Sequence, residues 1–461
     1  MYYRQPLNLH TEVDTLLTPD LGQRAAAMRE FAPGLESPSL VSSYDGSIDR
    51  ILFCFPSWAV SDPELVGGYT SVIGALRVGT RFIAVHNSSV RDAVEGWFTD
   101  AGHPMQNVEL VPLPDFVAVT DWAEDAYVSL KDAADGAGYL MEPWSFARFG
   151  DALIADAVEE HTDIRASSAP LIFQGGNCLI GDDFWLLGKD YFADTVAFLT
   201  DDRSPVTVPS GTQPAAFATE LFSTYVDARR RLGQIGTKKP IPLQDYVGTR
   251  AGDDYFLDIP SGGTGTFQPI FHIDMLLTLV GPGTDGVFRV LVGSPTLADE
   301  MLGTSSPFAL AEVYDGIARD LERSGFAVTR NPLVHRPTLG QALSLGRLKE
   351  LSKGPDGSAL VPAVAQLSSA GAVDATMVTV RDWHHITWNN CLVENSEAAG
   401  RHVYLPTFGH GDNADLAAVD SAMERLWKDL GFTPHLLGDF NGFARRLGVV
   451  HCIKKYVTRG G

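Results

Sequence analysis

The fold is indicated most clearly by the stretch ILFCFPSWAVSDPELVGGYTSVIGALRVGTRFIAVH (residues 51–86). Residues 51–58 and 81–86 are short apolar runs typical of buried strands, and residues 67–79 between them have the pattern of a helix. A second helix pattern follows at 89–102, and another strand pattern at 107–114. Such alternation of strands and helices is typical of an α/β fold.

The length of the chain predicts one large domain or a closely fused pair. It has 461 residues, 45% of them hydrophobic, and single cores rarely grow beyond about 250–300 residues. Residues 1–47 contain the Pro, Ser and Gly of FAPGLESPSL (31–40), which is typical of a surface segment. We therefore expect a lead-in over 1–47 that packs on a domain spanning 48–461.

The charge of the chain argues against nucleic acid and membranes as partners. There are 57 acidic and 35 basic residues, which gives a formal net charge of −22. Such a surface repels phosphate backbones and anionic lipids and attracts cations. No stretch approaches the roughly 18 apolar residues that cross a bilayer, and the first residues lack a signal-peptide pattern. The sequence predicts a soluble, cytoplasmic protein.

The cysteines indicate neither a structural metal site nor a disulfide framework. Cys54, Cys178, Cys391 and Cys452 lie far apart in the sequence, and none belongs to a CxxC motif. A reducing compartment fits this pattern. We expect no metal and no cofactor, and three of the four thiols to be inert core side chains.

Four segments place a reactive or charged residue inside an apolar run that we interpret as a strand. They are TDWAEDAYV (120–128), FQGGNCLIG (173–181), QPIFHIDMLLTLVG (268–281) and GVVHCIKKYV (448–457). Taken singly, each has an ordinary structural explanation, such as a small buried cysteine or a histidine paired with a neighbouring acid. The period of a strand places His272 and Asp274 on one face, which predicts that they form a pair.

Together the segments contain what attack on a guanidinium group requires. The group is planar and permanently charged, so two carboxylates, Asp125 and Asp274, could hold it from both sides. Its carbon is a poor electrophile and needs a strong nucleophile, which the thiolate of Cys452 would supply. A histidine can give a proton to the leaving nitrogen and take one from water, and His272 would fill this role.

In this order the segments resemble the guanidino-group modifying superfamily of deiminases, dihydrolases and amidinotransferases, and most of all the peptidylarginine deiminases. The motifs are Trp122-x-x-Asp125, Gly175-Gly176-Asn177, Phe271-His272-x-Asp274 and His451-Cys452. The resemblance implies a pseudo-fivefold α/β propeller, or pentein, of ββαβ modules as the catalytic domain. It also implies a covalent amidino adduct on Cys452, proton transfer by His272, a substrate clamp of Asp125 and Asp274, and a slot for the aliphatic part of the substrate lined by Trp122.

The implied activity is hydrolytic deimination of arginine to citrulline and ammonia, with an arginine-containing peptide or protein as substrate. Gln174 precedes the Gly-Gly pair where small-molecule deiminases usually carry Glu, which favours a peptidyl substrate. Ala126 stands where the vertebrate enzymes have a calcium-binding carboxylate, so calcium control is not carried over. Three alternative functions remain open: a deiminase or dihydrolase of free arginine, agmatine or another small guanidino compound, an amidinotransferase, and a binding protein with this fold. A homodimer also remains open.

Overall fold

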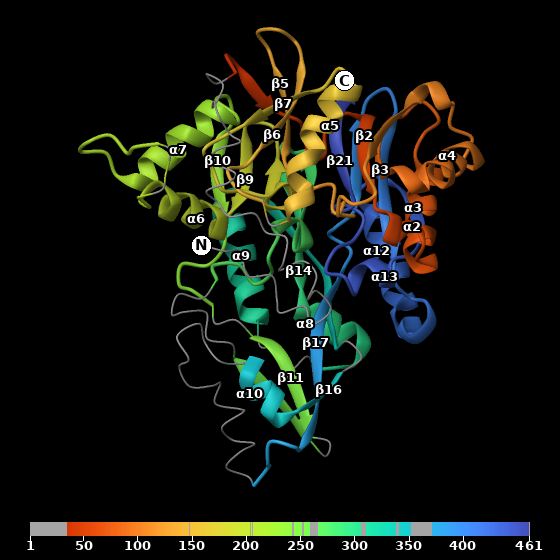
Figure 1. The fold of residues 1–461 in the computed structure, drawn as a ribbon, viewed down its shortest axis with the longest axis vertical. Helices are drawn as coiled ribbons and strands as arrows, with labels where there is room; N and C mark the ends of the chain where they lie inside the picture. The colour runs from red at the N-terminus through yellow and green to blue at the C-terminus, as the bar shows by residue number, and fades with distance from the viewer. Residues whose placement is uncertain are drawn as a thin grey trace.

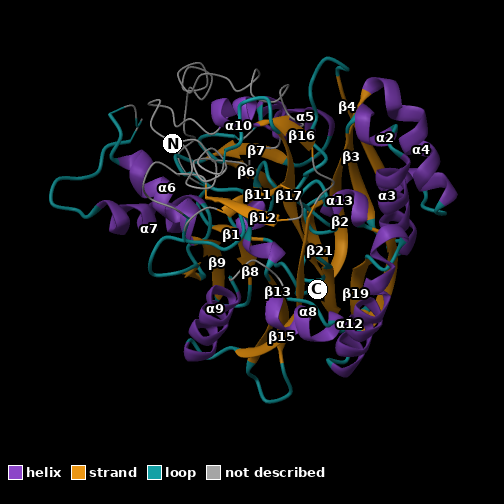
Figure 2. Cartoon of the chain, turned by 90° about the horizontal axis from the view of Figure 1, so that it is seen from below, coloured by secondary structure: helices purple, strands orange, loops and turns teal. Residues whose placement is uncertain are grey.

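The computed structural model describes residues 35–460, apart from 147, 203, 205, 242–243, 251–252, 259–265, 306–309, 338–340 and 352–370. Within these ranges the strands form five sheets, and most helices lie at the periphery (Figures 1 and 2). The expected α/β propeller is therefore the fold. Of the predicted lead-in, residues 1–34 lie outside the described part, whereas β1 (Pro38–Leu40) pairs with a strand of the main body.

The five sheets repeat one arrangement of strands. A first strand pairs antiparallel with a second strand, and the second pairs in parallel with a third. The chain passes through at least one helix between the second strand and the third, as the right-handed crossover of a parallel pair requires. Each module is thus a ββαβ unit.

The bounds of the module elements are as follows. The first strands are β5 (Val128–Asp132), β8 (Cys178–Ile180), β13 (Leu277–Pro282), β18 (Leu392–Ser396) and β21 (Lys454–Gly460). The second strands are, in the same order, β6 (Gly138–Glu142), β9 (Phe184–Gly188), β14 (Phe288–Ser294), β19 (Gly400–Thr407) and β2 (Ser47–Phe55). The third strands are β7 (Arg165–Ser168), β10 (Arg231–Ile235), β15 (Ala327–Pro337), β20 (Thr433–Asp439) and β3 (Arg81–Asn87).

Helices connect the second and third strands of each module. They are α5 (Ile154–His161), α6 (Lys189–Leu199) with α7 (Pro214–Tyr225), α8 (Pro295–Leu302) with α9 (Ala311–Arg323), α12 (Ala417–Asp429), and α2 (Ser57–Val60) with α3 (Pro63–Ala75). Their buried residues recur at helical spacing, as with Tyr314, Ile317, Ala318 and Leu321 on α9. The predicted helix over 67–79 corresponds to α3, and its predicted flanking strands correspond to β2 and β3.

Two additions extend the modules. The helix α4 (Arg91–Asp100) leads to β4 (Val108–Leu113), which pairs with β3. A longer sheet grows from β15 through β17 (Met377–Thr387) to β11 (Gln244–Arg250) and β12 (Asp253–Asp258), and β16 (Gln341–Ser344) also pairs with β17. This part, with α10 (Leu345–Leu351), projects away from the modules at the bottom of Figure 1.

The last module joins the two ends of the described chain. Strand β21 pairs antiparallel with β2, from Ser47 opposite Gly460 to Phe53 opposite Lys454. Residues of β2 such as Ile51 and Phe53 are fully buried, so closing this sheet removes apolar surface from water. The pairing also fixes the residues just before β21 relative to the rest of the protein.

A buried carboxylate links this module to its neighbour. Glu394 on β18 has no exposed surface and forms an ion pair with Arg77 at 2.6 Å. It also accepts hydrogen bonds from the Ile48 backbone N–H at 2.9 Å and from the Tyr404 hydroxyl at 3.0 Å. Because these partners come from three other parts of the chain, Glu394 acts as a polar tie between β18, β19, β2 and the end of α3.

We predict that Glu394→Gln lowers the free energy of unfolding by about 3 kcal/mol, because it breaks a largely buried ion pair and weakens two further bonds. The Arg77 side chain is 40% exposed, which places the loss near the lower end of the range for buried pairs. Urea unfolding measures it. The matched control is Asp415→Asn, whose exposed pair with Arg336 should change stability by about 0.5 kcal/mol or less. Equal effects in both variants would contradict the role of Glu394.

Candidate active site

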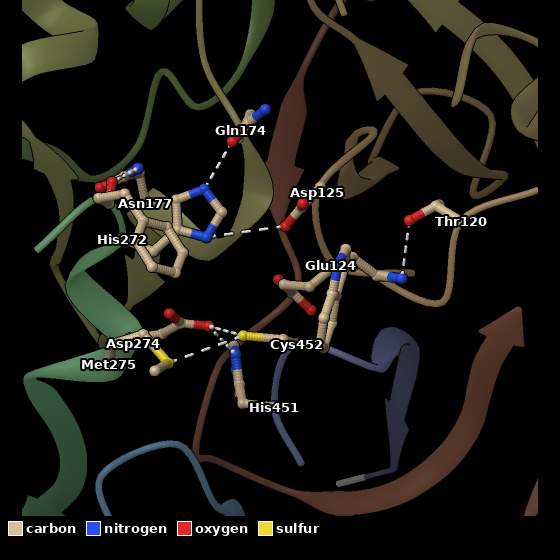
Figure 3. A network of polar contacts seen from close by, with 12 residues as sticks. Thr120, Glu124, Asp125, Gln174, Asn177, His272, Asp274, Met275, His451 and Cys452 are labelled. Atoms are coloured by element: carbon tan, nitrogen blue, oxygen red, sulfur yellow. Dashed lines mark hydrogen bonds and ion pairs between the residues drawn. The ribbon is translucent and has the colours of Figure 1, made fainter. Parts of the chain in front are cut away.

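Each module presents a polar or reactive residue in the turn just before its first strand. Asp125 precedes β5, Asn177 ends the 3-10 turn η5 (Gly175–Asn177) before β8, and Asp274 lies in the 3-10 turn η6 (Ile273–Met275) before β13. Asn390 precedes β18 and Cys452 precedes β21. These turns meet, since η5 contacts η6 and β21 contacts β5. The site is therefore built from strand starts of all five modules, since Asn390 also contacts Cys452. Figure 3 shows the turns that carry Asp125, Asn177, Asp274 and Cys452.

This geometry corrects the prediction that the four motifs lie inside strands. In a strand, alternate side chains point to opposite faces and the backbone is engaged in the ladder. The turns free the chain from that constraint, so several consecutive polar groups can face the site. His272 is not on a strand with Asp274, but lies immediately before η6. Among the contacts described, His272 bonds Gln174 and Asp274 bonds His451, and the prediction that His272 and Asp274 act together stays a prediction.

Cys452 is almost fully buried, and its sulfur is surrounded by polar groups. Asn390 Nδ2 donates to Sγ at 3.2 Å, Asp274 Oδ2 lies 3.7 Å from Sγ, and Met275 Sδ lies at 4.0 Å. Burial raises the pKa of the Cys452 thiol well above its usual value, and the charges of Asp274 and Asp125 add to this effect. The resting side chain is thus a thiol, and a nearby cation would favour its ionisation.

Asp274 is paired with the residue next to the cysteine. Its Oδ2 accepts a hydrogen bond from His451 Nδ1 at 2.8 Å. Burial, together with the neighbouring lysines, lowers the pKa of His451 to about 4, so the ring is neutral at pH 7 and donates through Nδ1–H. Burial also raises the pKa of Asp274, against the stabilising bond from His451. Within the described residues, Asp274 Oδ1 has no hydrogen-bond partner, which leaves this oxygen for a ligand.

His272 is held by Gln174 from the side opposite Asp125. Its Nε2 lies 2.5 Å from Gln174 Oε1, which also accepts a hydrogen bond from the Tyr191 hydroxyl at 2.6 Å. An amide oxygen only accepts, so Nε2 carries the hydrogen and Nδ1 carries the lone pair. Nδ1 lies 3.7 Å from Asp125 Oδ1. Burial lowers the pKa of His272, which suits a neutral ring that can take up a proton.

Asp125 is not a free arm of a clamp. Its Oδ2 accepts from Arg148 Nη2 at 2.8 Å, and Arg148 also binds Asp151 through Nε and Nη2. No local pattern predicted this contact, since Arg148 lies 23 residues away in an irregular segment. One oxygen of Asp125 thus remains for a ligand or for His272.

Trp122 is partly exposed and fixed in place by the segment before Cys452. Its ring packs edge-on against Phe443, with centroids 6.1 Å apart. It also lies so close to Gly448 that a Cβ at that position would be 2.2 Å from the ring. The predicted role of Trp122 in lining a substrate slot stays a prediction.

Asn390 is the functional residue that the sequence argument missed. Besides its bond to the Cys452 sulfur, its Oδ1 accepts from the backbone N–H groups of His451 at 2.8 Å and Cys452 at 3.2 Å. It therefore holds the turn that carries the nucleophile. Its segment, WNN (388–390) before an apolar strand, resembles GGN (175–177) in the same position of another module, and this repeat is the signal that could have identified it.

No group of three or more His, Cys, Asp or Glu side chains within the described ranges is arranged to hold a metal ion. In the same part of the chain, no helix is long and apolar enough to cross a membrane.

The fold is shared with solved structures of agmatine deiminases. No protein-family model matches the chain, and no curated protein matches it. The agmatine deiminase of Enterococcus faecalis is 13% identical, with a TM-score of 0.52 over 93% of this chain and 97% of that one. The C. jejuni agmatine deiminase is 11% identical, with a TM-score of 0.50 over 92% and 98%. At such identities the likeness establishes the fold alone, and this protein has the α/β-propeller fold of these enzymes.

Proposed function

We propose that this protein is a cysteine-dependent hydrolase that deiminates a guanidinium group, and that its substrate is a small guanidino compound. The observation that carries the proposal is the buried Cys452 sulfur 3.7 Å from Asp274 Oδ2, in a site that also contains His272 and Asp125. These are the nucleophile, the proton carrier and the carboxylates that the reaction requires. The fold shared with agmatine deiminases supports the same class of reaction.

Substrate binding and thiol ionisation are linked by charge. A guanidinium beside Cys452 would take Asp274 Oδ1 as one acceptor and Asp125 Oδ1 as another, each of which lies in a buried carboxyl group. The bound cation would offset the negative charges that raise the pKa of the Cys452 thiol. The thiolate therefore forms most readily when substrate is present, and Asn390 Nδ2 donates a hydrogen bond to it.

The chemical steps balance with one histidine as proton carrier. His272 takes the thiol proton, and the thiolate bonds to the guanidinium carbon. His272 then gives that proton to a terminal nitrogen, the C–N bond breaks and ammonia leaves, which creates a covalent amidino adduct. Water attacks the adduct carbon while His272 takes one of its protons, the C–S bond breaks, and His272 returns that proton to the sulfur. The second water proton leaves the new carbonyl oxygen and is taken up by the released ammonia. The products are a ureido compound and ammonium.

The small-compound alternative has better support than a peptidyl arginine. The sequence argument for a peptide relied partly on Gln174 as a substrate-recognition residue, but the Gln174 amide oxygen is engaged by Tyr191 and His272. The reacting side chains are also deeply buried, with Cys452 and His272 each 2% exposed and Asp274 1% exposed. Enclosure of this kind favours a substrate that the site can surround completely.

We predict that Cys452→Ala leaves the protein folded but lowers guanidine hydrolysis by more than about a thousandfold, because the covalent step needs the thiolate. Ureido product and ammonia are measured together, and circular dichroism checks the fold. Cys178→Ala is the matched control, since Cys178 is also a buried free thiol but bonds only the Gln174 carbonyl, at 3.6 Å. Loss of activity in the control alone would contradict the assignment of Cys452.

We predict that agmatine or free arginine is turned over with a kcat/KM at least about tenfold higher than benzoyl-arginine amide, a difference of about 1.4 kcal/mol. Competition between the substrates, with each ureido product quantified by mass spectrometry, measures the preference. A preference for the blocked arginine would restore the peptidyl substrate. An amidino product that appears only with an added amine would instead identify a transferase.

We predict that Asn390→Ala lowers kcat about 10–100-fold, because a hydrogen bond to a charged group is worth about 1.5–3 kcal/mol. The rate of Cys452 alkylation by iodoacetamide at fixed pH should fall as well, since the thiolate loses its donor. Asn413→Ala is the control, because the Asn413 side chain bonds Asn441 instead. Unchanged alkylation and turnover in Asn390→Ala would remove this residue from the site.

A further inference from the structure

A second group of buried charges lies directly behind the nucleophile. The Glu124 carboxylate binds Lys454 Nζ at 2.7 Å through Oε2 and Lys455 Nζ at 2.8 Å through Oε1. All three side chains are buried, with Lys454 fully enclosed. We call these three residues the lysine cluster. Within the described residues, neither lysine has another ion pair, so the cluster carries one excess positive charge when both lysines are protonated.

The cluster joins two of the turns that form the active site. The Glu124 backbone N–H donates to the Cys452 carbonyl at 3.0 Å, and Glu124 directly precedes Asp125. The lysines begin β21 two and three residues after Cys452. Lys454 Nζ also lies 3.8 Å from the centre of the Tyr456 ring, which Arg459 contacts at the same distance. The lysine ammonium groups are therefore fixed relative to the nucleophile.

A purely structural tie would not require the second lysine. Burying an ammonium costs several kcal/mol unless an opposite charge compensates it, and one carboxylate compensates one lysine. The remaining positive charge acts on what surrounds it. Lys454 favours the charged form of Asp274, and both lysines oppose protonation of His451.

The groups that face Asp274 and His451 come from several elements. Asp274 on η6 faces His451, Cys452 and the charges of Glu124 and Lys454. His451 faces Asp274, both lysines, and the Tyr456 ring at 5.8 Å. Lys454 thus acts on both Asp274 and His451, and Lys455 acts on His451.

We propose that Lys454 and Lys455 are positioning residues that keep Asp274 ionised and His451 neutral, so that Asp274 presents its full charge to a cationic substrate. The assignment of a guanidinium substrate rests on the proposed function, whereas the effect on His451 does not. If His451 were protonated, its charge would cancel that of Asp274 and the site would attract a cation less strongly. Burial lowers the pKa of His451 most, and the positive charges of the two lysines oppose protonation of the ring further.

The direct test is a titration of His451 by NMR in protein with 15N-labelled histidine, with the signal assigned by its loss in His451→Gln. In Lys454→Met, the titration midpoint should rise by at least about one pH unit, because a neighbouring positive charge is gone. Lys454→Arg keeps the charge and should leave the midpoint near its native value. Lys428→Met is the matched control, since Lys428 is 57% exposed and pairs with Glu424 on the same helix.

Kinetics provide the second measurement. With agmatine as substrate, KM for Lys454→Met should be about tenfold or more above that of the native protein at acidic pH, because one pH unit changes the ratio of protonated to neutral His451 tenfold. Above the new His451 midpoint, KM should return to the native value. Lys454→Arg should keep the native pH dependence even if kcat falls. Lys455→Met gives the same test through the second lysine if Lys454→Met does not fold.

The outcomes separate the two proposals. A native His451 midpoint in folded Lys454→Met and Lys455→Met, whatever their stability, would reduce the cluster to a structural tie and overturn the inference. A shifted midpoint in a protein that hydrolyses none of the guanidino compounds would uphold the effect of the lysines and reject the proposed function. A shifted midpoint with the matching change in KM supports both.

Discussion

The active site depends on the pairing of β21 with β2. This antiparallel contact joins residues near the two ends of the described chain. It places Cys452 just before β21, whose partner strand β2 is buried from Arg50 to Phe55. The turns of the other four modules bring their polar groups to the same place, because each precedes the first strand of its sheet. A shift in this register would move the nucleophile away from Asp274 and Asn390, which come from different sheets.

The chemistry of the site follows from charges enclosed where water is scarce. Burial raises the pKa of the Cys452 thiol, and the charges of Asp274 and Asp125 add to this effect. Their charges are compensated only in part, by Arg148 on one side and by the lysine cluster on the other. Burying these carboxylates costs free energy when no cation is bound, and a bound cation lowers that cost. Burial and this imbalance of charge together keep Cys452 protonated at rest, and the same imbalance is the physical basis for the proposed guanidinium substrate.

Several particular errors show the limits of reasoning from sequence. The strand period placed His272 and Asp274 on one face of a strand, but Asp274 lies in a 3-10 turn that His272 precedes, and their hydrogen-bond partners are Gln174 and His451. Gln174 in place of Glu was interpreted as favouring a peptidyl substrate, but its amide oxygen is engaged by His272 and Tyr191. Arg148 and Asn390 were missed because their partners lie 23 and 62 residues away, and no local pattern encodes contacts at such separations.

The sequence by itself determined the α/β alternation, through apolar runs and helical spacing, and it indicated the candidate site residues through their order along the chain. These features are local, so propensity and short motifs record them. The pairing of side chains in the site was decided only by the tertiary structure. Five turns from five sheets meet there, and the state of each ionisable group depends on burial and on charges brought together by folding. The excess positive charge behind Cys452 is such a property, since Glu124 and its two lysines lie more than 300 residues apart in the sequence.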